Sequence, residues 1–248
     1  MRLEGKTAIV TGGASGFGAG IARKFAAEGA QVMIVDLDHD GAMAMADELG
    51  AGHFGHRANV AKSAEVAEVV ATARQVFGEV DILVNNAGIT HLPKAMEEVD
   101  EAEFDRVFAV NCKSVYLFAR ELAPFMKLRK AGAILNLAST AAVSPRPRLS
   151  WYNASKGWMN TATKAMAVEL APYGVRVNAL NPVAGETPLL ASFMGEDTPE
   201  IRAKFLSTIP LGRFSTPEDM GNAACFLCSD EASMVTGVCM EVDGGRCI

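Results

Sequence analysis

Short apolar segments alternate with longer amphipathic segments along almost the whole chain. The short segments are rich in β-branched residues, and this composition predicts buried strands. They cover residues 7–10, 31–35, 81–84, 133–137, 175–179 and 238–242, with a fainter candidate at 53–58. Helical spacing and composition predict helices over residues 18–28, 41–49, 63–77, 104–129, 154–171 and 217–227.

This alternation predicts the fold class. Strands that are apolar throughout and separated by helices are typical of a parallel sheet with helices on both faces. We therefore expect one α/β domain over residues 1–248, with about seven strands and right-handed connections. Residues 181–217 are expected to be irregular, and a lid over a substrate site is predicted at about 186–210. Pro124 is expected near a bend or an end of its long helical segment.

Composition and charge exclude several classes of function. The 248 residues are 50% hydrophobic, which is ordinary for a globular protein with a sizeable core. The formal net charge of -6 offers no basic surface for nucleic acid or for an anionic membrane. No apolar run has the length of a membrane span, and the first residues lack a signal-peptide pattern. A cytoplasmic protein is therefore expected.

The five cysteines do not indicate a disulfide framework, because their number is odd and they are scattered. Cys225 and Cys228 have the spacing of a redox or zinc motif, but they lie in a predicted helix without a second ligand pair. We interpret them as helix-packing residues and predict no metal site.

A glycine-rich loop, residues 11–18 (Thr-Gly-Gly-Ala-Ser-Gly-Phe-Gly), directly follows the first predicted strand and opens a helix. Glycines at 12, 16 and 18 permit a tight turn and close approach of a pyrophosphate to the helix N-terminus. Turn chemistry alone is the alternative, but the position between strand and helix favours dinucleotide binding.

Asp36 ends the second predicted strand, where a ribose-binding acid is expected. A carboxylate there accepts hydrogen bonds from both ribose hydroxyls and repels a 2′-phosphate. Ser15, Leu37 and Asp38 supply no cation for that phosphate. NAD is therefore predicted over NADP; the alternative is that Asp36 caps the next turn.

Tyr152 and Lys156 are four residues apart, so that a helix would place them on one face. An unperturbed phenol has a pKa of about 10, and a neighbouring ammonium would lower it toward the working range of an acid–base catalyst. An exposed helical pair with no catalytic role is the alternative.

These motifs occur in a specific order. The glycine loop is followed by Asn85-Asn86-Ala87-Gly88, by Ser139 after the fifth strand, and by Tyr152-x-x-x-Lys156. From about Lys6 to Gly245 the chain resembles the short-chain dehydrogenase/reductase family. The resemblance implies a Rossmann-type doubly wound sheet, NAD(P)-dependent interconversion of alcohols and carbonyls, and a homotetramer.

The resemblance also implies a catalytic tetrad of Asn111, Ser139, Tyr152 and Lys156. Tyr152 would be the general acid or base, and Lys156 would lower its pKa and hold the nicotinamide ribose. Ser139 would hydrogen-bond the substrate oxygen. Asn111 would hold a water that links Lys156 to solvent. Taken alone, Asn111 would be a helix-interrupting residue and Ser139 a strand-end cap.

The implied cofactor contacts extend along the chain. They are Gly12, Ser15, Gly16, Phe17, Gly18, Asp36, Asn59, Val60, Asn86, Ala87, Gly88, Tyr152, Lys156, Pro182, Val183, Gly185 and Thr187. Two positions depart from the family pattern. Asn59 replaces an acidic residue, and Val183 replaces the glycine of an Asn-Pro-Gly segment, so that the backbone around Val183 and Gly185 is less certain.

Candidate substrate contacts cluster around the expected pocket: His91, Arg146, Arg148, Trp151, Leu190, Phe193 and Met194. Either arginine could pair with an anionic substrate group, or both could be solvated or contact another subunit. A narrower likeness, in residues 185–188, 209–214 and 243–246, is to members that oxidise aromatic or cyclic alcohols and aldehydes. We therefore expect NAD-linked catabolic oxidation of a small-molecule substrate, a small cyclic, aromatic or polyol alcohol. The alternatives are an oxoacyl-carrier-protein reductase and a non-catalytic NAD-binding scaffold.

Overall fold

A single parallel sheet organises the molecule. In the computed structural model, which describes residues 1–196 and 198–248, seven strands pair in the order β3-β2-β1-β4-β5-β6-β7. They are β1 (Thr7–Thr11), β2 (Gln31–Asp36), β3 (Phe54–Arg57), β4 (Ile82–Asn85), β5 (Gly132–Leu137), β6 (Val175–Pro182) and β7 (Cys239–Val242). The order reverses between β1 and β4, so that a crevice is expected at their carboxyl ends.

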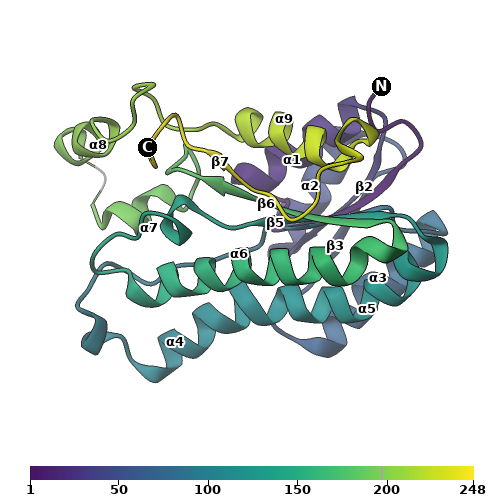
Figure 1. The fold of residues 1–248 in the computed structure, drawn as a ribbon, viewed down its shortest axis with the longest axis horizontal. Helices are drawn as coiled ribbons and strands as arrows, with labels where there is room; N and C mark the ends of the chain where they lie inside the picture. Colours follow the sequence, from purple (N-terminus) through teal and green to yellow (C-terminus); the bar gives the residue numbers. More distant parts are fainter. Residues whose placement is uncertain (197) are drawn as a thin grey trace.

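Helices cover both faces of this sheet (Figure 1). They are α1 (Gly16–Ala27), α2 (His39–Leu49), α3 (Ser63–Phe77), α4 (Glu101–Phe108), α5 (Ser114–Arg129), α6 (Ser150–Leu170), α7 (Leu190–Met194), α8 (Pro199–Leu206) and α9 (Pro217–Cys228). One hydrophobic cluster joins α1, α2 and α9 to the sheet through residues such as Phe25 and Met220. A second cluster joins α3, α5 and α6 to the opposite face through residues such as Val69 and Phe118. The predicted Rossmann-type α/β fold is therefore confirmed.

The long helical segment predicted over residues 104–129 is not one regular helix. A π-helical turn, Ala109–Lys113, joins α4 to α5. Pro124 lies inside α5, which continues to Arg129, so that the irregularity expected near the proline occurs instead at the π-turn. Such turns are rare and are frequently found at functional sites, and this one contains Asn111.

Residues 181–217 are less irregular than expected, because they contain α7 and α8. Thr198 caps α8 by accepting a hydrogen bond from Ile201 N, and Pro199 occupies the first turn, where its missing N–H costs nothing. Pro199 thus begins a helix in this segment. Both helices lie at the carboxyl end of the sheet, beside the C-terminus (Figure 1).

Two cysteines of α9 belong to the hydrophobic core. Cys225 and Cys228 lie on α9 as buried free thiols in this core, which confirms their packing role.

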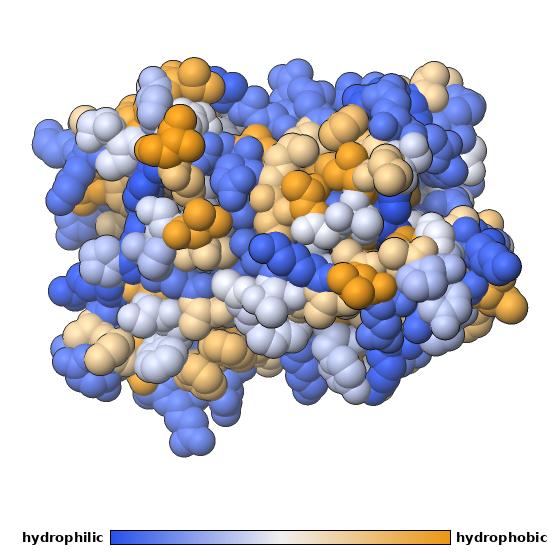
Figure 2. Space-filling model, viewed as in Figure 1, coloured by the Kyte–Doolittle hydropathy of each residue, from blue (hydrophilic) through white to orange (hydrophobic). Residues whose placement is uncertain are grey.

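Figure 2 shows hydrophobic residues interspersed among hydrophilic ones on the visible face. Within the part of the chain that the structure describes, no helix has the length and apolar character needed to cross a membrane.

Candidate active site

A cavity of about 460 Å³ lies at the carboxyl end of the sheet. Its walls come from the loops after β1, β2, β3, β4, β5 and β6, from α6, and from the short helices α7 and α8. A volume of this size is typical of cofactor and ligand sites. The site lies where the strand order reverses, as expected for a doubly wound sheet.

The N-terminus of α1 forms the phosphate end of this cavity. Ser15 occupies the N-cap position without a side-chain cap bond, and the first turn of α1 contains no acidic residue. The backbone N–H groups there are therefore not used by side chains and can bind an anion. A Cβ atom on Gly18 would lie 2.1 Å from the Gly12 carbonyl oxygen, so that only glycine permits this tight loop. These observations fit a bound pyrophosphate.

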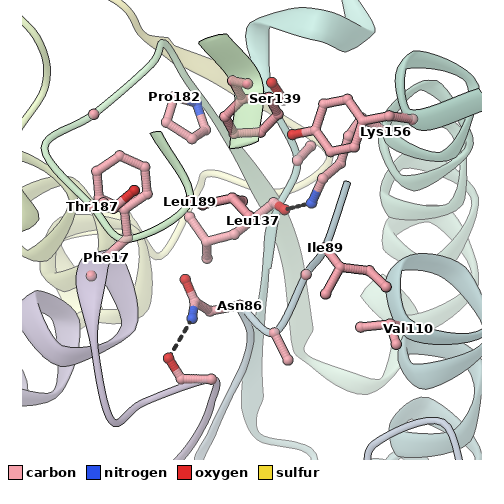
Figure 3. Close-up of a pocket in the computed structure, with 18 of the residues that line it drawn as sticks. Phe17, Asn86, Ile89, Val110, Leu137, Ser139, Lys156, Pro182, Thr187 and Leu189 are labelled. Carbon is pink, nitrogen blue, oxygen red and sulfur yellow. Dashed lines mark hydrogen bonds between the residues drawn. The ribbon is translucent and has the colours of Figure 1, made fainter. Parts of the chain in front are cut away.

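Asn86 holds the glycine loop in place. Its Nδ2 donates to the carbonyl oxygens of Thr11 and Gly12, at 2.8 and 2.9 Å, and Figure 3 shows the amide directed at the loop. Thr11 Oγ1 in turn accepts from the N–H groups of Asn86 and Ala87, both at 3.0 Å. The sequence predicted cofactor contact for Asn86 and Ala87, which do line the cavity, but missed this positioning role.

Asp36 lines the cavity at the end of β2. Its carboxylate accepts from Ala14 N at 3.1 Å and from Asp38 N at 3.2 Å. The predicted turn-capping bond is therefore present at Oδ1, which accepts from Asp38 N. Oδ2 accepts from Ala14 N and holds Asp36 against the glycine loop. Sequence reasoning missed Arg57, which lies opposite Asp36 in the β2–β3 register. Arg57 is not among the described residues that line the cavity.

Asn59 and Val60 form the neighbouring wall, as predicted. Asn59 Oδ1 accepts from Ala61 N at 3.0 Å, and Asn59 N donates to Glu65 Oε2 at 2.7 Å. These bonds fix the turn at the start of α3 and place the buried Val60 side chain against the cavity. Val60 supplies apolar surface to this wall, and Asn59 supplies a polar amide.

Tyr152 and Lys156 lie on the opposite wall. Both residues are only 4% exposed, so that the alternative of a solvent-exposed helical pair is wrong. Lys156 Nζ donates to the Leu137 carbonyl oxygen at 2.7 Å and lies 5.9 Å from the centre of the Tyr152 ring. Figure 3 shows the Lys156 side chain extending from α6 toward the end of β5.

The pKa of Tyr152 moves opposite to the direction expected from the sequence. Burial raises it to about 12, and the opposing influences are a hydrogen bond with Ser139 and the charge of Arg146. Burial also lowers the pKa of Lys156 to about 8. Spacing alone could not show that both side chains are buried, and burial disfavours the charged form of each.

Ser139 follows β5 and lines the cavity beside these two residues. Its Oγ accepts from Ala141 N at 3.1 Å, while its backbone N–H donates to Asn181 Oδ1 at 3.3 Å. The strand-end cap expected of an isolated serine is therefore present. The same residue faces Tyr152 closely enough to oppose the rise in its pKa, so that Ser139 both caps the strand end and lines the wall that holds Tyr152.

Asn111 is fully buried in the π-turn and is not among the described residues that line the cavity. Its Nδ2 donates to Ile89 O at 2.9 Å and to Ser155 Oγ at 3.0 Å, and its Oδ1 accepts from Ile89 N. Ser155 Oγ donates to Tyr152 O at 2.7 Å. Sequence reasoning missed Ser155, whose only signal was a small polar residue inside the Tyr-x-x-x-Lys motif.

The last residue of β6, Pro182, and the segment that follows it form the roof of the cavity, with Val183, Gly185 and Thr187. The φ angle of Val183 is not positive, so that valine replaces glycine there without strain. At Gly185 a Cβ atom would lie 2.2 Å from Phe17 Cζ. The position that requires glycine is therefore 185, and Figure 3 shows Phe17 beside Thr187.

Two of the predicted substrate residues, Arg146 and Phe193, line the cavity. The Phe193 ring meets the Tyr152 ring edge-on, with 5.1 Å between centroids. Leu189 lines the cavity as well, and so do Leu149 and Phe205, which were absent from the predicted contacts. Phe205 lies on α8, which the sequence did not predict as a helix.

The other predicted substrate residues are not among the described residues that line the cavity. Trp151 donates its Nε1–H to Met96 O at 3.0 Å, and Arg148 Nη2 donates to Pro93 O at 3.3 Å. Leu190 and Met194 pack in a small apolar cluster behind Val183. His91 is buried, with Nδ1 2.9 Å from Leu92 O.

Comparison with known proteins agrees with this geometry. A family model described as enoyl-(acyl carrier protein) reductase matches residues 12–246. A 4-formylbenzenesulfonate dehydrogenase from Comamonas testosteroni is 51% identical, with 99% of each chain covered. A D-threitol dehydrogenase from Mycolicibacterium smegmatis is 39% identical, with 100% of this chain and 95% of the relative covered.

Among solved structures, a 3-ketoacyl-(acyl-carrier-protein) reductase from Brucella melitensis, complexed with NADH, is 52% identical with a TM-score of 0.95. The alignment covers 99% of this chain and 100% of that chain. These matches extend through both the phosphate end and the Tyr152 wall of the cavity. The chain therefore belongs to the short-chain dehydrogenase/reductase family and is an NAD(P)-binding oxidoreductase that acts on CH–OH groups.

Proposed function

We propose that the protein is an NAD-linked dehydrogenase that oxidises a small cyclic, aromatic or polyol alcohol, with Tyr152 as the proton-transferring residue. One observation carries this proposal: Ser139, Tyr152 and Lys156 line the same cavity as the glycine loop and Asp36. When bound, the dinucleotide exchanges a hydride with the substrate carbon.

The side chains present suit the proton half of this reaction. Ser139 holds the substrate oxygen through its hydroxyl and orients it toward Tyr152. Tyr152 takes the hydroxyl proton during oxidation and returns it during reduction. Lys156 holds the nicotinamide ribose and carries a positive charge at neutral pH, since its pKa is about 8. Asn111 positions α6 through Ser155, and a water held near it would connect Lys156 with solvent.

The preference for NAD over NADP rests on Asp36. Its carboxylate faces the cavity beside the exposed Leu37, where a 2′-phosphate would meet like charge. Arg57 is the neighbour of Asp36 on the adjacent strand, and its positive charge acts on Glu65. The pKa of Glu65 is lowered chiefly by the Asn59 N–H, then by Lys62 and Arg57. The glycine loop and the roof residues Pro182, Val183, Gly185 and Thr187 complete the proposed cofactor site.

Relatives support the substrate class. Those described above act, by name, on a formylbenzenesulfonate, on a four-carbon polyol and on a 3-ketoacyl thioester of acyl carrier protein. The cavity presents Leu149, Phe193 and Phe205 to the substrate, which suits a ring or a short chain. A 3-oxoacyl-carrier-protein reductase is the second candidate, because the 52% identical structure has that activity in its name.

The decisive experiment is an assay of the purified protein with NAD and NADP against aromatic, cyclic and polyol alcohols and a 3-oxoacyl thioester. Turnover of an alcohol with NAD, lost in Tyr152→Phe with NADH binding retained, is the expected result. Preference for NADPH and a 3-oxoacyl thioester would favour the second candidate. Binding of NAD without turnover of any substrate would indicate a scaffold.

We also propose a homotetramer in the cytoplasm. The outer faces of α5 and α6 expose Tyr116, Trp158 and Val168, apolar residues that a subunit interface would cover. Sedimentation equilibrium tests this: a mass four times that of the 26.2 kDa chain is expected, and a monomer at micromolar concentration would contradict it.

A further inference from the structure

Arg146 presents a positive charge to the substrate end of the cavity. It lies in the loop between β5 and α6 and is among the residues that line the cavity. Its guanidinium carbon stands 4.0 Å above the centre of the Phe205 ring. This stacking fixes the plane of the guanidinium and leaves its N–H edge free to donate.

No carboxylate balances this charge in the part of the chain that the structure describes. Arg129 pairs with Asp81, and Arg213 pairs with Asp219. By contrast, the Arg146 guanidinium has neither an ion pair nor a hydrogen-bond acceptor among residues 1–196 and 198–248. Burial lowers its pKa to about 10, so that the group is desolvated yet still charged at neutral pH. An unpaired cation in such a place is costly unless an anion binds it.

A second guanidinium, that of Arg246, adds positive charge near Arg146. Arg246 lies close enough to Arg146 to lower its pKa further. Arg246 Nη1 is 3.4 Å from Ser144 Oγ, and its buried Nε has no partner within the described chain. The adjacent Asp243 carboxylate is occupied by the N–H groups of Gly245 and Cys247, at 2.9 and 2.8 Å. Among the described residues, no carboxylate contributes to the shift in the Arg146 pKa, so that the charge of Arg246 acts on Arg146 without an opposing acid.

Arg146 also acts on Tyr152. Burial is the largest influence on the pKa of Tyr152 and raises it, whereas Ser139 and the charge of Arg146 lower it. Phe193 and Phe205, both lining residues, present apolar surface in the same part of the cavity. We propose that Arg146, assisted by Arg246, binds a carboxylate or sulfonate group at the far end of a substrate whose alcohol or carbonyl reacts at Tyr152. This inference rests on the proposed function and deepens it by naming an acidic substrate class.

Binding of inert anions tests the proposal independently of turnover. Benzenesulfonate and the uncharged methyl phenyl sulfone are titrated by calorimetry into the protein saturated with NAD. We expect benzenesulfonate to bind more tightly than the sulfone, and Arg146→Ala to weaken it at least about tenfold. Arg246→Ala should weaken it less. Arg148→Ala is the matched control, because that arginine is two residues away but outside the cavity lining.

Three results would overturn the proposal. They are equal binding of the sulfonate and the sulfone, unchanged sulfonate binding in Arg146→Ala, and equal loss in Arg148→Ala. A tenfold loss of NAD affinity in Arg146→Ala would also overturn it, because the cation would then serve the cofactor phosphates. Should Arg146→Ala fold poorly, Arg146→Gln retains the side-chain stem; thermal melting and NADH binding verify either variant.

Kinetics separate this inference from the proposed function. For 4-(hydroxymethyl)benzoate and 4-methylbenzyl alcohol, the ratio of kcat/KM values cancels any shared effect of Arg146 on Tyr152. The ratio should fall at least about tenfold in Arg146→Ala, mainly through KM. If neither alcohol reacts but the sulfonate binding pattern holds, the proposed function fails and the anion site stands. If both alcohols react and the ratio is unchanged, the inferred anion site is contradicted, while the proposed function stands.

Discussion

The ring of Phe193 meets the ring of Tyr152 edge-on, with 5.1 Å between their centroids. Phe193 belongs to α7, so that the segment predicted as a lid contacts the phenol expected to carry the proton. This contact excludes water from Tyr152 and contributes to the burial that raises its pKa to about 12. Lid position and acid–base chemistry are therefore physically coupled.

Phe193→Ala should lower the pKa of Tyr152 toward the ordinary value of about 10, because the phenol gains access to water. Alcohol oxidation needs the phenolate, so that the rising limb of its pH profile should move to lower pH. KM for apolar alcohols should rise at the same time. The measurement is kcat/KM against pH, with Met194→Ala as control, since Met194 packs behind the roof. A profile identical to that of the parent would contradict the coupling.

Tyr152→Phe should reduce kcat by about 10²–10⁴-fold, which is the usual contribution of a positioned acid–base group. The ring is retained, so that its contact with Phe193 and the packing of α6 are unchanged. Stopped-flow or steady-state absorbance at the reduced-nicotinamide band measures the rate, and fluorescence titration measures NADH affinity. Turnover near the parent level would show that another group transfers the proton.

Asp36→Ala should move cofactor preference toward NADP by at least about tenfold, because it removes a charge that opposes the 2′-phosphate. The hydrogen bond from Ala14 N is lost as well, so that affinity for NAD should fall. The check is kcat/KM for both cofactors with one alcohol. Asp40→Ala removes an exposed carboxylate nearby and should leave the ratio unchanged. An equal change of cofactor preference in both variants would contradict the role assigned to Asp36.

Gly185→Ala should weaken NAD binding, since the new Cβ would lie 2.2 Å from Phe17 Cζ and displace the roof from the glycine loop. Phe17→Ala in the same chain should restore part of the affinity, because it removes the clashing ring. A double-mutant cycle of dissociation constants measures this coupling. Val183→Gly is the control and should have the smaller effect. Strictly additive losses would mean that the contact between Phe17 and Gly185 is not the cause.

Carbonyl reduction should lose efficiency as pH rises through about 8. Burial depresses the pKa of Lys156 to about 8, so that its ammonium is present below this pH and lost above it. Reduction also needs Tyr152 in its protonated form, which its raised pKa maintains over this range. Values of kcat/KM from pH 6 to 10 report the free enzyme. A flat profile through this range would exclude a requirement for charged Lys156.

Local patterns in the sequence determined much of this architecture. Continuous apolar strands can be satisfied only by a sheet buried on both faces, and the confirmed α3, Ser63–Phe77, follows directly from its helical spacing. The glycine loop and Asp36 were identifiable because their role depends on backbone conformation and on position at a strand end. The order of the motifs identified the family before any geometry was known.

Tertiary structure decided the features that depend on neighbours distant in sequence. Phe17 dictates glycine at 185 rather than at 183, and Ser155 links Asn111 to the backbone of Tyr152. Arg146 and Arg148 look equivalent in sequence, yet only Arg146 lines the cavity. The sign of the Tyr152 pKa shift follows from burial. Sequence spacing encodes which groups can meet on one element, whereas desolvation and contact between elements exist only once the chain is folded.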